Sequence, residues 1–174
     1  MRQLALSRHM RDLAMTDELT RLPNRRHFLA LAEVALTQAL KQGAPLALAG
    51  IDIDHFKRIN DTYGHAVGDV ILQRTAHALR MALRPGDAIG RIGGEEFLVL
   101  LKGAARDEAV SAAERLRIAV AGIDCSDVTP DLKLSISLGV AARGERVVRL
   151  EQLCKEADDA LYRAKANGRN RVEV

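Results

Sequence analysis

Two glycines followed by two carboxylates lie between two apolar runs, at Gly93, Gly94, Glu95 and Glu96. Glycine adopts backbone angles closed to other residues and leaves no side chain in the way of a bulky ligand. Carboxylate oxygens are the ligands that Mg²⁺ prefers, and the ion commonly bridges them to substrate phosphates. The four residues therefore indicate a turn that could bind a nucleoside triphosphate with its metal. The simpler alternative is a hairpin turn with a solvated acidic edge.

A second acidic pair, Asp52 and Asp54, alternates with isoleucines after the apolar run 46–50, which predicts a buried strand ending in carboxylates. Alternation along a strand places both side chains on one face. Buried carboxylates are costly unless a cation or hydrogen bonds compensate, so we predict that Asp52 joins Glu95 and Glu96 in a metal site. Asp54 could instead cap the following helical turn. Regular alternation also separates Glu95 from Glu96, so both reach one metal only if the glycine turn breaks the pleat.

Periodicity predicts the elements that position these residues, in the central order β-α-β-β-α-β. The predicted helices cover residues 25–41, 66–83, 106–121 and about 150–164, and the predicted strands cover 46–54, two short segments beside the glycine turn, 132–141 and 171–174. Asn24 is the expected cap of the first of these helices. The order predicts an α+β fold, with an antiparallel sheet and helices packed on one face. Residues 1–15 are predicted to be an N-terminal linker or signalling helix, and residues 16–174 a single domain.

Composition bounds the class of protein. The chain has 174 residues and a net charge of +3, which suits an anionic substrate, but it has no basic tract with interleaved aromatics, so no nucleic-acid binding is expected. No segment has the apolar length to span a bilayer and no signal-peptide pattern opens the chain, so we expect a cytoplasmic location without membrane insertion. Cys125 and Cys154 have neither metal-type nor redox-type spacing and are expected to be incidental thiols.

Four blocks of sequence together resemble the GGDEF domain, the catalytic module of diguanylate cyclases, in its GGEEF form. They are residues 17–26 (DELTRLPNRR), residues 52–65 (DIDHFKRINDTYGH) continued by Gly68 and Asp69, residues 91–97 (RIGGEEF), and residues 157–170 (ADDALYRAKANGRN). The blocks occur in the order of the family and span roughly residues 16–174. The departures are small, since Ile92 stands where an aromatic residue is common and Glu95 keeps the carboxylate of the Asp in the family name.

The resemblance implies a palm-like, ferredoxin-like fold shared with nucleotide cyclases and polymerases. It implies that two GTP molecules are condensed into cyclic di-GMP with release of two pyrophosphates. Two Mg²⁺ or Mn²⁺ ions per half-site would be held by Asp52, Glu95 and Glu96, with the backbone carbonyl of Ile53 as a further ligand. Glu96 could also help to deprotonate the attacking 3′-hydroxyl, and the sequence leaves these two roles open.

The resemblance also implies a substrate site. Asn60 and Asp69 would read guanine, because an amide and a carboxylate together match its donors and acceptors. The groups assigned to the phosphates are the side chains of Lys57, Lys165 and Arg169 and the backbone at His55, Phe56, Gly93 and Gly94. Without the resemblance, Asn60 would be interpreted as a helix cap or turn residue, and the lysines as solvated.

Three further expectations follow from the resemblance. Each subunit would hold one GTP, so catalysis would require a homodimer with a two-fold axis. Arg84 and Asp87 match the RxxD inhibitory site of the family, and Arg115 stands where the family has an additional arginine, which predicts product inhibition by cyclic di-GMP. The alternative interpretation of Arg84–Asp87 is an ordinary Pro-Gly turn. An upstream sensory or receiver domain is also expected.

Two alternatives to an active diguanylate cyclase stay open from the sequence. One is a catalytically silent module that senses GTP or cyclic di-GMP, although such domains usually lose the signature glycines or carboxylates that this chain retains. The other is a cyclase that accepts adenine nucleotides, since base selectivity depends on details of the pocket.

Overall fold

The computed structural model describes residues 15–144 and 149–174. Its helices are α2 (Arg25–Gln42), α3 (Phe56–Tyr63), α4 (His65–Ala82), α5 (Arg106–Ala121) and α6 (Leu150–Ala166). Its strands are β1 (Leu46–Ile53), β2 (Ala88–Arg91), β3 (Glu96–Lys102), β4 (Ile136–Ala142) and β5 (Val172–Glu173). The predicted β-α-β-β-α-β order and the α+β class are confirmed. The helix predicted over residues 1–15 lies outside the described residues except for its last position.

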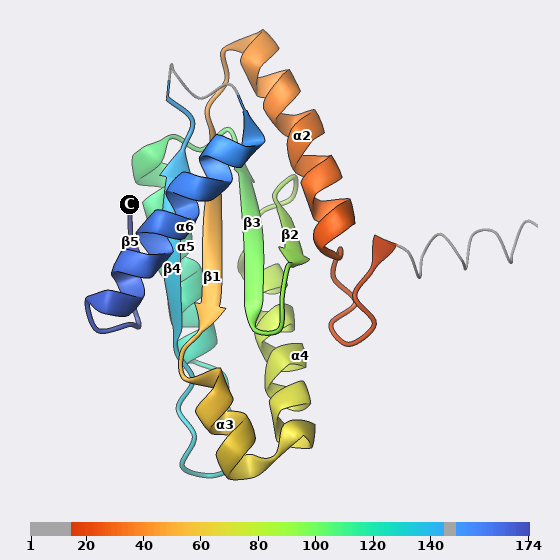
Figure 1. Ribbon diagram of the computed structural model, residues 1–174, viewed down its shortest axis with the longest axis vertical. Coiled ribbons are helices and arrows are strands. Elements are labelled where there is room, and N and C mark those ends of the chain that lie inside the picture. The colour runs from red at the N-terminus through yellow and green to blue at the C-terminus, as the bar shows by residue number, and fades with distance from the viewer. Residues whose placement is uncertain (1–14, 145–148) are drawn as a thin grey trace, which may run out of the picture.

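The strands form one sheet in the order β2-β3-β1-β4-β5, with β1 at its centre (Figure 1). β1 pairs antiparallel with both β3 and β4, and β2 pairs antiparallel with β3. Only the short pairing of β5 with β4 is parallel among the described strands. The sheet is therefore mostly antiparallel, as predicted. Asp52, near the end of β1, lies between strands β3 and β4.

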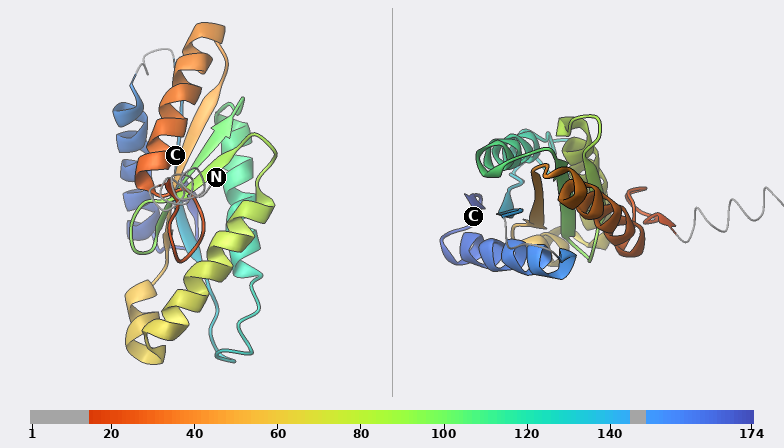
Figure 2. Two further views of the ribbon diagram at one scale, coloured as in Figure 1. Left: turned by 90° about the vertical axis from the view of Figure 1, so that its right-hand side faces the viewer. Right: turned by 90° about the horizontal axis from the view of Figure 1, so that it is seen from above.

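Helices cover both faces of the sheet, and the prediction of helices on one face is wrong (Figure 2). All eight residues of β1 are buried, so each face of the strand must be covered. One core contains Ile51 and Ile53 with residues of α4 and α5. The other contains Leu46 and Leu48 with residues of α2 and α6. The continuous apolar run 46–50 is typical of a strand buried on both faces.

Local signals explain the helix boundaries. The side chain of Asn24 accepts a hydrogen bond from the backbone N–H of His27 and caps α2, as predicted. α2 ends at Gly43, whose φ of 61° is in the left-handed region that glycine adopts without strain. α3 is not predicted from the sequence, because it has only eight residues and begins at His55 with a φ of 56° and no side-chain cap.

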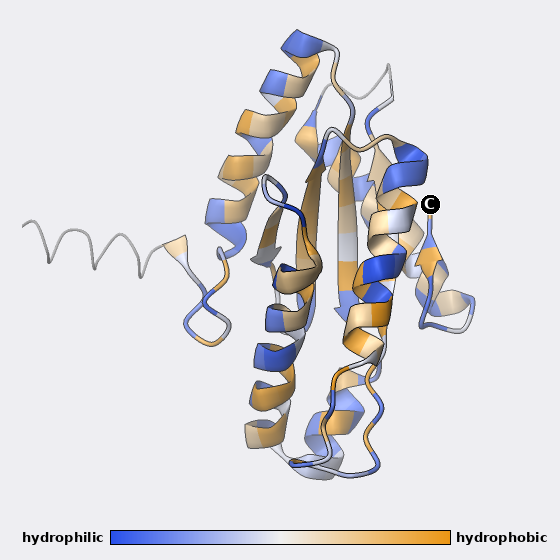
Figure 3. Ribbon diagram, turned by 180° about the vertical axis from the view of Figure 1, so that it is seen from behind, coloured by the Kyte–Doolittle hydropathy of each residue, from blue (hydrophilic) through white to orange (hydrophobic). Residues whose placement is uncertain are grey.

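The outer surfaces of the helices are largely hydrophilic, and their hydrophobic sides face the sheet (Figure 3). Among residues 15–144 and 149–174, no helix is both long and apolar enough to cross a membrane. Cys125 and Cys154 both carry free thiols. The amphipathic pattern is that of helices packed on a sheet.

Candidate active site

The acidic residues predicted to bind metal lie near one end of the central strand. Asp52 on β1 and Glu96 on β3 are directly opposite each other in the antiparallel pair. Opposite residues in such a pair project from the same face, and here this face is the one that carries Leu48 and Leu98 toward α2 and α6. Glu95 precedes β3 and belongs to the turn, so strand alternation does not govern it. The regular alternation therefore does not separate Glu95 from Glu96, and their joint binding of a metal stays a prediction.

Asp52 is the buried member of this group, with 8% of its surface exposed. Its Oδ2 atom accepts a hydrogen bond from Nζ of Lys165 at 2.8 Å. Burial raises the pKa of Asp52 and the charge of Asp54 adds to the rise, while Lys165 and Arg169 act against it. The sequence assigned Lys165 to a phosphate, and the structure places its ammonium beside a predicted metal ligand.

Glu95 is also affected by its acidic neighbours. Partial burial raises the pKa of Glu95, and the negative charges of Asp52 and Glu96 raise it further. Glu96 folds back over the turn, so that a methyl group on Gly93 would lie 2.8 Å from its Oε2 atom. The three carboxylates therefore concentrate negative charge at one end of the sheet, an arrangement that favours a bound cation.

The donor set has the chemistry of a Mg²⁺ site, since it consists of three carboxylates and the Ile53 carbonyl. Within the described residues, however, no three acidic, histidine or cysteine side chains converge closely enough to hold a metal ion. Asp52 is instead neutralised by Lys165. The residues thus fit a divalent cation by donor type and by shared face, but their side chains do not converge on one point as they stand.

Asp54 lies one residue beyond β1, and its carboxylate is hydrogen-bonded to residues of β4 and of the segment before it. Its carboxylate accepts hydrogen bonds at 2.6 Å from the hydroxyls of Ser135 and Ser137. It also accepts one at 3.0 Å from the backbone N–H of Asn170. The N-cap position of α3 belongs to His55, so the capping alternative for Asp54 is wrong. Asp54 fixes the segment that carries Arg169 to the end of the sheet.

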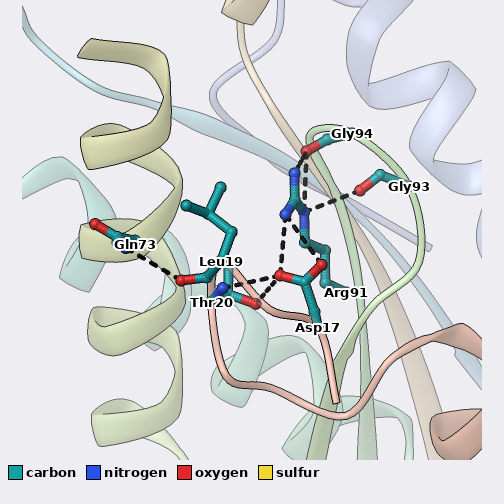
Figure 4. A network of polar contacts seen from close by, with 7 residues as sticks. All are labelled: Asp17, Leu19, Thr20, Gln73, Arg91, Gly93 and Gly94. Carbon is teal, nitrogen blue, oxygen red and sulfur yellow. Dashed lines mark hydrogen bonds and ion pairs between the residues drawn. The ribbon is translucent and has the colours of Figure 1, made fainter. Parts of the chain in front are cut away.

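Arg91 holds the glycine turn from outside (Figure 4). Its Nη2 atom donates to the carbonyl of Gly94 at 2.8 Å, and its Nε atom donates to the carbonyls of Gly93 and Gly94 at 3.2 Å. Its Nη1 atom donates to the carboxylate of Asp17 at 2.9 Å. Asp17 in turn accepts from the backbone N–H of Thr20 at 2.8 Å and from its hydroxyl at 2.7 Å. The guanidinium therefore connects the turn that bears Glu95 to the N-terminal segment.

No role was predicted for Arg91 or Asp17, although both lie in the matched blocks 91–97 and 17–26. Partial burial works to raise the pKa of Asp17, but the hydrogen bonds from Thr20 and Arg91 outweigh it and hold the pKa below its ordinary value. The available signal was the position of each charged residue inside a matched block. The contact itself joins residues 74 positions apart, which local pattern does not reveal.

The two predicted guanine readers lie on the two helices that meet at Gly64. Asn60 lies on α3 and Asp69 on α4, and only Gly64 separates the two helices. The side chain of Asn60 lies against Gly68, the neighbour of Asp69 in the chain. The structure thus places the Asn60 side chain against the residue that precedes Asp69, and the joint reading of guanine by the amide and the carboxylate stays a prediction.

The predicted phosphate ligands surround the same end of the sheet from two elements. Lys57 is exposed in the first turn of α3, beside the backbone of His55 and Phe56, where N–H groups of the first turn lack helical partners. Arg169 follows α6 with a φ of 63°. Lys165 donates a hydrogen bond to Asp52, and the charge of Arg169 also lowers the pKa of that carboxyl. Binding of phosphate by these cationic groups stays a prediction.

The predicted inhibitory residues form a separate small pocket of about 40 Å³ lined by Arg84, Asp87 and Arg115 among others. The Nε atom of Arg115 donates to the carbonyl of Ala82 at 3.0 Å. Its Nη2 atom is buried and has no hydrogen-bond partner in the described part of the chain. Asp87 accepts from the backbone N–H of Lys102 at 3.2 Å. The turn interpretation accounts for the backbone here but leaves the Arg115 donor unexplained.

Comparison with known proteins identifies the family of the chain. The family description "Diguanylate cyclase, GGDEF domain" matches residues 14–171, so the chain belongs to the GGDEF domain family. Diguanylate cyclase DgcP of Pseudomonas aeruginosa is 43% identical over 94% of this chain and 24% of its own length. Response regulator PleD of Caulobacter vibrioides is 40% identical over 94% of this chain and 37% of its own. The chain thus spans well under half the length of these curated relatives.

Solved structures show the same fold. The coiled coil and GGDEF domain of DgcB from Caulobacter crescentus, solved in complex with c-di-GMP, superimposes with a TM-score of 0.91 at 31% identity, covering 99% of this chain and 91% of that one. The active GGEEF domain of a diguanylate cyclase from Vibrio cholerae gives a TM-score of 0.83 at 33% identity, covering 87% of this chain and 96% of that one. The GGDEF fold predicted from the sequence is confirmed.

Proposed function

We propose that the chain is a diguanylate cyclase that joins two GTP molecules into cyclic di-GMP and releases two pyrophosphates. The observation that carries the proposal is the concentration of three carboxylates, Asp52, Glu95 and Glu96, at one end of the sheet. Asn60 and Asp69 lie on the two helices that follow β1 in the chain. Carboxylates for divalent cations next to a polar base pocket are what nucleotidyl transfer from GTP requires.

In the proposed reaction, the 3′-oxygen of one GTP attacks the α-phosphorus of the other. The new bond is the 3′-O–P bond, the broken bond joins the α-phosphorus to the bridging oxygen, and pyrophosphate leaves with the electron pair. The proton of the hydroxyl passes to a base, for which Glu96 is the candidate. A second, symmetric transfer closes the ring. Such reactions need in-line positioning and neutralisation of charge more than covalent help from the protein.

Asp52, Glu95, Glu96 and the Ile53 carbonyl would hold divalent cations, which when bound lower the pKa of the attacking hydroxyl and neutralise phosphate charge. Magnesium or manganese, two per half-site, is our proposal for their identity and number. Asn60 and Asp69 orient the base, and Lys57 and Arg169 bind phosphate oxygens. Lys165 neutralises Asp52 in this structure and is long and flexible enough to serve a phosphate as well, since lysine acts as a point charge on a mobile stem.

We further propose that catalysis takes place between two copies of the domain, because one site presents one GTP and the attacking hydroxyl must come from another. The segment upstream of residue 16 is proposed to set this pairing and to receive the signal of a further domain. Specific activity should fall when the protein is diluted below the dissociation constant of the dimer. Constant specific activity from high to nanomolar concentration would contradict catalysis between copies.

The pocket at Arg84, Asp87 and Arg115 is proposed to bind cyclic di-GMP and to inhibit the enzyme. The buried, unpartnered Nη2 atom of Arg115 supports this, because an unsatisfied buried donor is costly and a guanine or phosphate oxygen would satisfy it. Arg84→Ala should weaken both binding of cyclic di-GMP and inhibition by about tenfold or more. Arg80→Ala is the control, since Arg80 lies on α4 outside this pocket. Equal inhibition of the Arg84 variant and wild type would overturn the assignment.

The deciding experiment incubates the purified protein with GTP and Mg²⁺ at high concentration and separates the products by chromatography. Glu96→Gln should lower the yield of cyclic di-GMP at least about 100-fold. Glu151→Gln, an exposed carboxylate on α6, should leave it unchanged. Binding of GTP or cyclic di-GMP by a dimeric sample that forms no product would favour the silent sensing module. Parallel reactions with ATP, and with a mixture of ATP and GTP, test base selectivity.

A further inference from the structure

Gly68 lies where a glycine is not required by the backbone. It is the fourth residue of α4, and it is absent from the residues that adopt a positive φ. A glycine inside a helix costs about 1 kcal/mol relative to alanine. Alanine would therefore be the better residue at this position if conformation alone decided it.

Space explains the glycine. A methyl group built at Gly68 would overlap Oδ1 of Asn60 and would lie 3.0 Å from Cγ of the same side chain. It would also lie 3.3 Å from Cζ of Phe56, a contact that a small movement of the ring relieves. Asn60 and Phe56 are one turn apart on α3, so this face of α3 packs directly on the bare backbone of α4. The absent side chain of Gly68 is the space that the Asn60 amide occupies.

The backbone of Asn60 is fixed independently of this contact. Its carbonyl accepts a hydrogen bond from the N–H of Gly64 at 2.8 Å, and Gly64 in turn accepts one from the N–H of Gly68 at 3.1 Å. The two helices are thus joined at their junction by backbone bonds. A methyl group at residue 68 would therefore be accommodated by rotation of the Asn60 side chain, and not by separation of the helices.

We propose that Gly68 is a positioning residue for base recognition, which sets the place of the Asn60 amide relative to Asp69. The inference rests on the proposed function, because it concerns the guanine pocket of the proposed enzyme. Asp69 follows Gly68 in the chain, so contact of Asn60 with residue 68 fixes the spacing of the amide and the carboxylate. Groups that read one base must keep this spacing within a fraction of an ångström.

The test is Gly68→Ala, studied by binding and by NMR. The probe is α,β-methylene-GTP, which resists cleavage at the α-phosphorus, with the matching ATP analogue measured beside it. We expect Gly68→Ala to fold, with a Tm no more than a few degrees below that of wild type. It should bind the GTP analogue at least about tenfold more weakly. The preference for the GTP analogue over the ATP analogue should narrow. The side-chain amide signals of Asn60 should shift even without nucleotide.

Two further variants make the test specific. In an Asn60→Ala background the overlapping atoms are gone, so adding Gly68→Ala should cause no further loss of binding. Gly122→Ala is the matched control, because Gly122 ends α5 with a negative φ and a methyl group there would lie 3.5 Å from its nearest neighbour. That control should bind as wild type does.

Equal binding by wild type and Gly68→Ala would overturn the inference, as would full additivity of the two substitutions or normal binding by Asn60→Ala. If the wild-type protein binds neither analogue, the proposed function fails instead. The Asn60 signals then still decide the contact, since an unshifted amide in Gly68→Ala would overturn it.

Discussion

The hold of Arg91 on the glycine turn can be tested by replacing it with lysine. Lysine keeps the charge but offers one nitrogen, whereas the guanidinium reaches the carbonyls of Gly93 and Gly94 and the carboxylate of Asp17 together. Arg91→Lys can preserve one side of this bridge and must give up the other. The glycine turn would then be tethered to β2 and β3 by its backbone alone.

The magnitude follows from the contacts that are lost. At least two charge-assisted hydrogen bonds disappear, each worth roughly 1.5–3 kcal/mol when well shielded. The side chains of Arg91 and Asp17 are 14% and 24% exposed, so water recovers part of this, and we expect a loss of about 2–3 kcal/mol in unfolding free energy. For a domain of this size such a loss lowers Tm by roughly 4–12 °C. Displacement of the turn by about 1 Å should lower kcat by about 10–100-fold.

Denaturant unfolding and product chromatography measure the two effects on the same samples. Arg74→Lys is the control, because Arg74 also joins a carboxylate, that of Asp127, to a backbone carbonyl, that of Asp124, but at a more exposed position. It should lose less than about 1 kcal/mol and no activity. Asp17→Asn completes a double-mutant cycle with Arg91→Lys, for which we expect a coupling energy of at least about 1 kcal/mol. An Arg91→Lys protein as stable and as active as the Arg74 control would refute the reasoning.

Three further outcomes are expected. The pKa of Asp17 is lowered in the folded state. Its ionised carboxylate therefore stabilises the fold above the ordinary aspartate pKa of about 3.9, and this contribution is lost as the pH falls through the folded pKa. The unfolding free energy of Asp17→Asn, measured down to pH 3, should therefore fall less steeply than that of wild type. Gly139→Ala should cost at least about 3 kcal/mol or prevent folding, because its methyl group would overlap the backbone of Ala157 and Leu161 in α6, and a urea midpoint unchanged from wild type would contradict this. Asp54→Asn replaces an acceptor of three hydrogen bonds by a group that also donates, so it should cost about 1–3 kcal/mol and raise KM for GTP more than it lowers kcat.

Elements with strong periodicity could be predicted from the sequence because each is determined by nearby residues. Asn24 and Gly43 mark the ends of α2, and both act as a cap in the structure. The apolar run 46–50 predicted the central strand. The same run also indicated burial on both faces, but the β-α-β-β-α-β order was interpreted as a sheet with one covered face. The continuous apolar run was the better guide, since all eight residues of β1 are buried in the structure.

Features that depend on contacts between distant segments could not be predicted from local pattern. α3 begins after His55, which has a left-handed backbone conformation and makes no side-chain capping bond, so the sequence has no capping signal for this helix. Asp54 is satisfied by serines more than 80 positions away, and its role therefore differs from that of Asp52 two residues earlier. The sequence indicates that a buried carboxylate must have hydrogen-bond or charge partners, but it does not show which residues these are.

The observed contact of Lys165 differs from the role assigned to it from the sequence. Its place in a matched block assigned it to phosphate, yet its ammonium lies 2.8 Å from Oδ2 of Asp52, a residue 113 positions earlier that was assigned to metal. The two assignments are compatible, because Asp52 is buried and requires a positive partner whichever cation supplies it. Lys165 lies on the last turn of α6, so its backbone is fixed, but its ammonium is on a flexible four-carbon chain. The same side chain can therefore neutralise Asp52 or contact a phosphate. The arrangement follows from the close contact of α6 with β4 at Gly139, which sets the end of the helix beside the end of the sheet. Gly139 pairs with Gly50 of β1, two residues before Asp52, so this close packing helps to bring the last turn of α6 near Asp52.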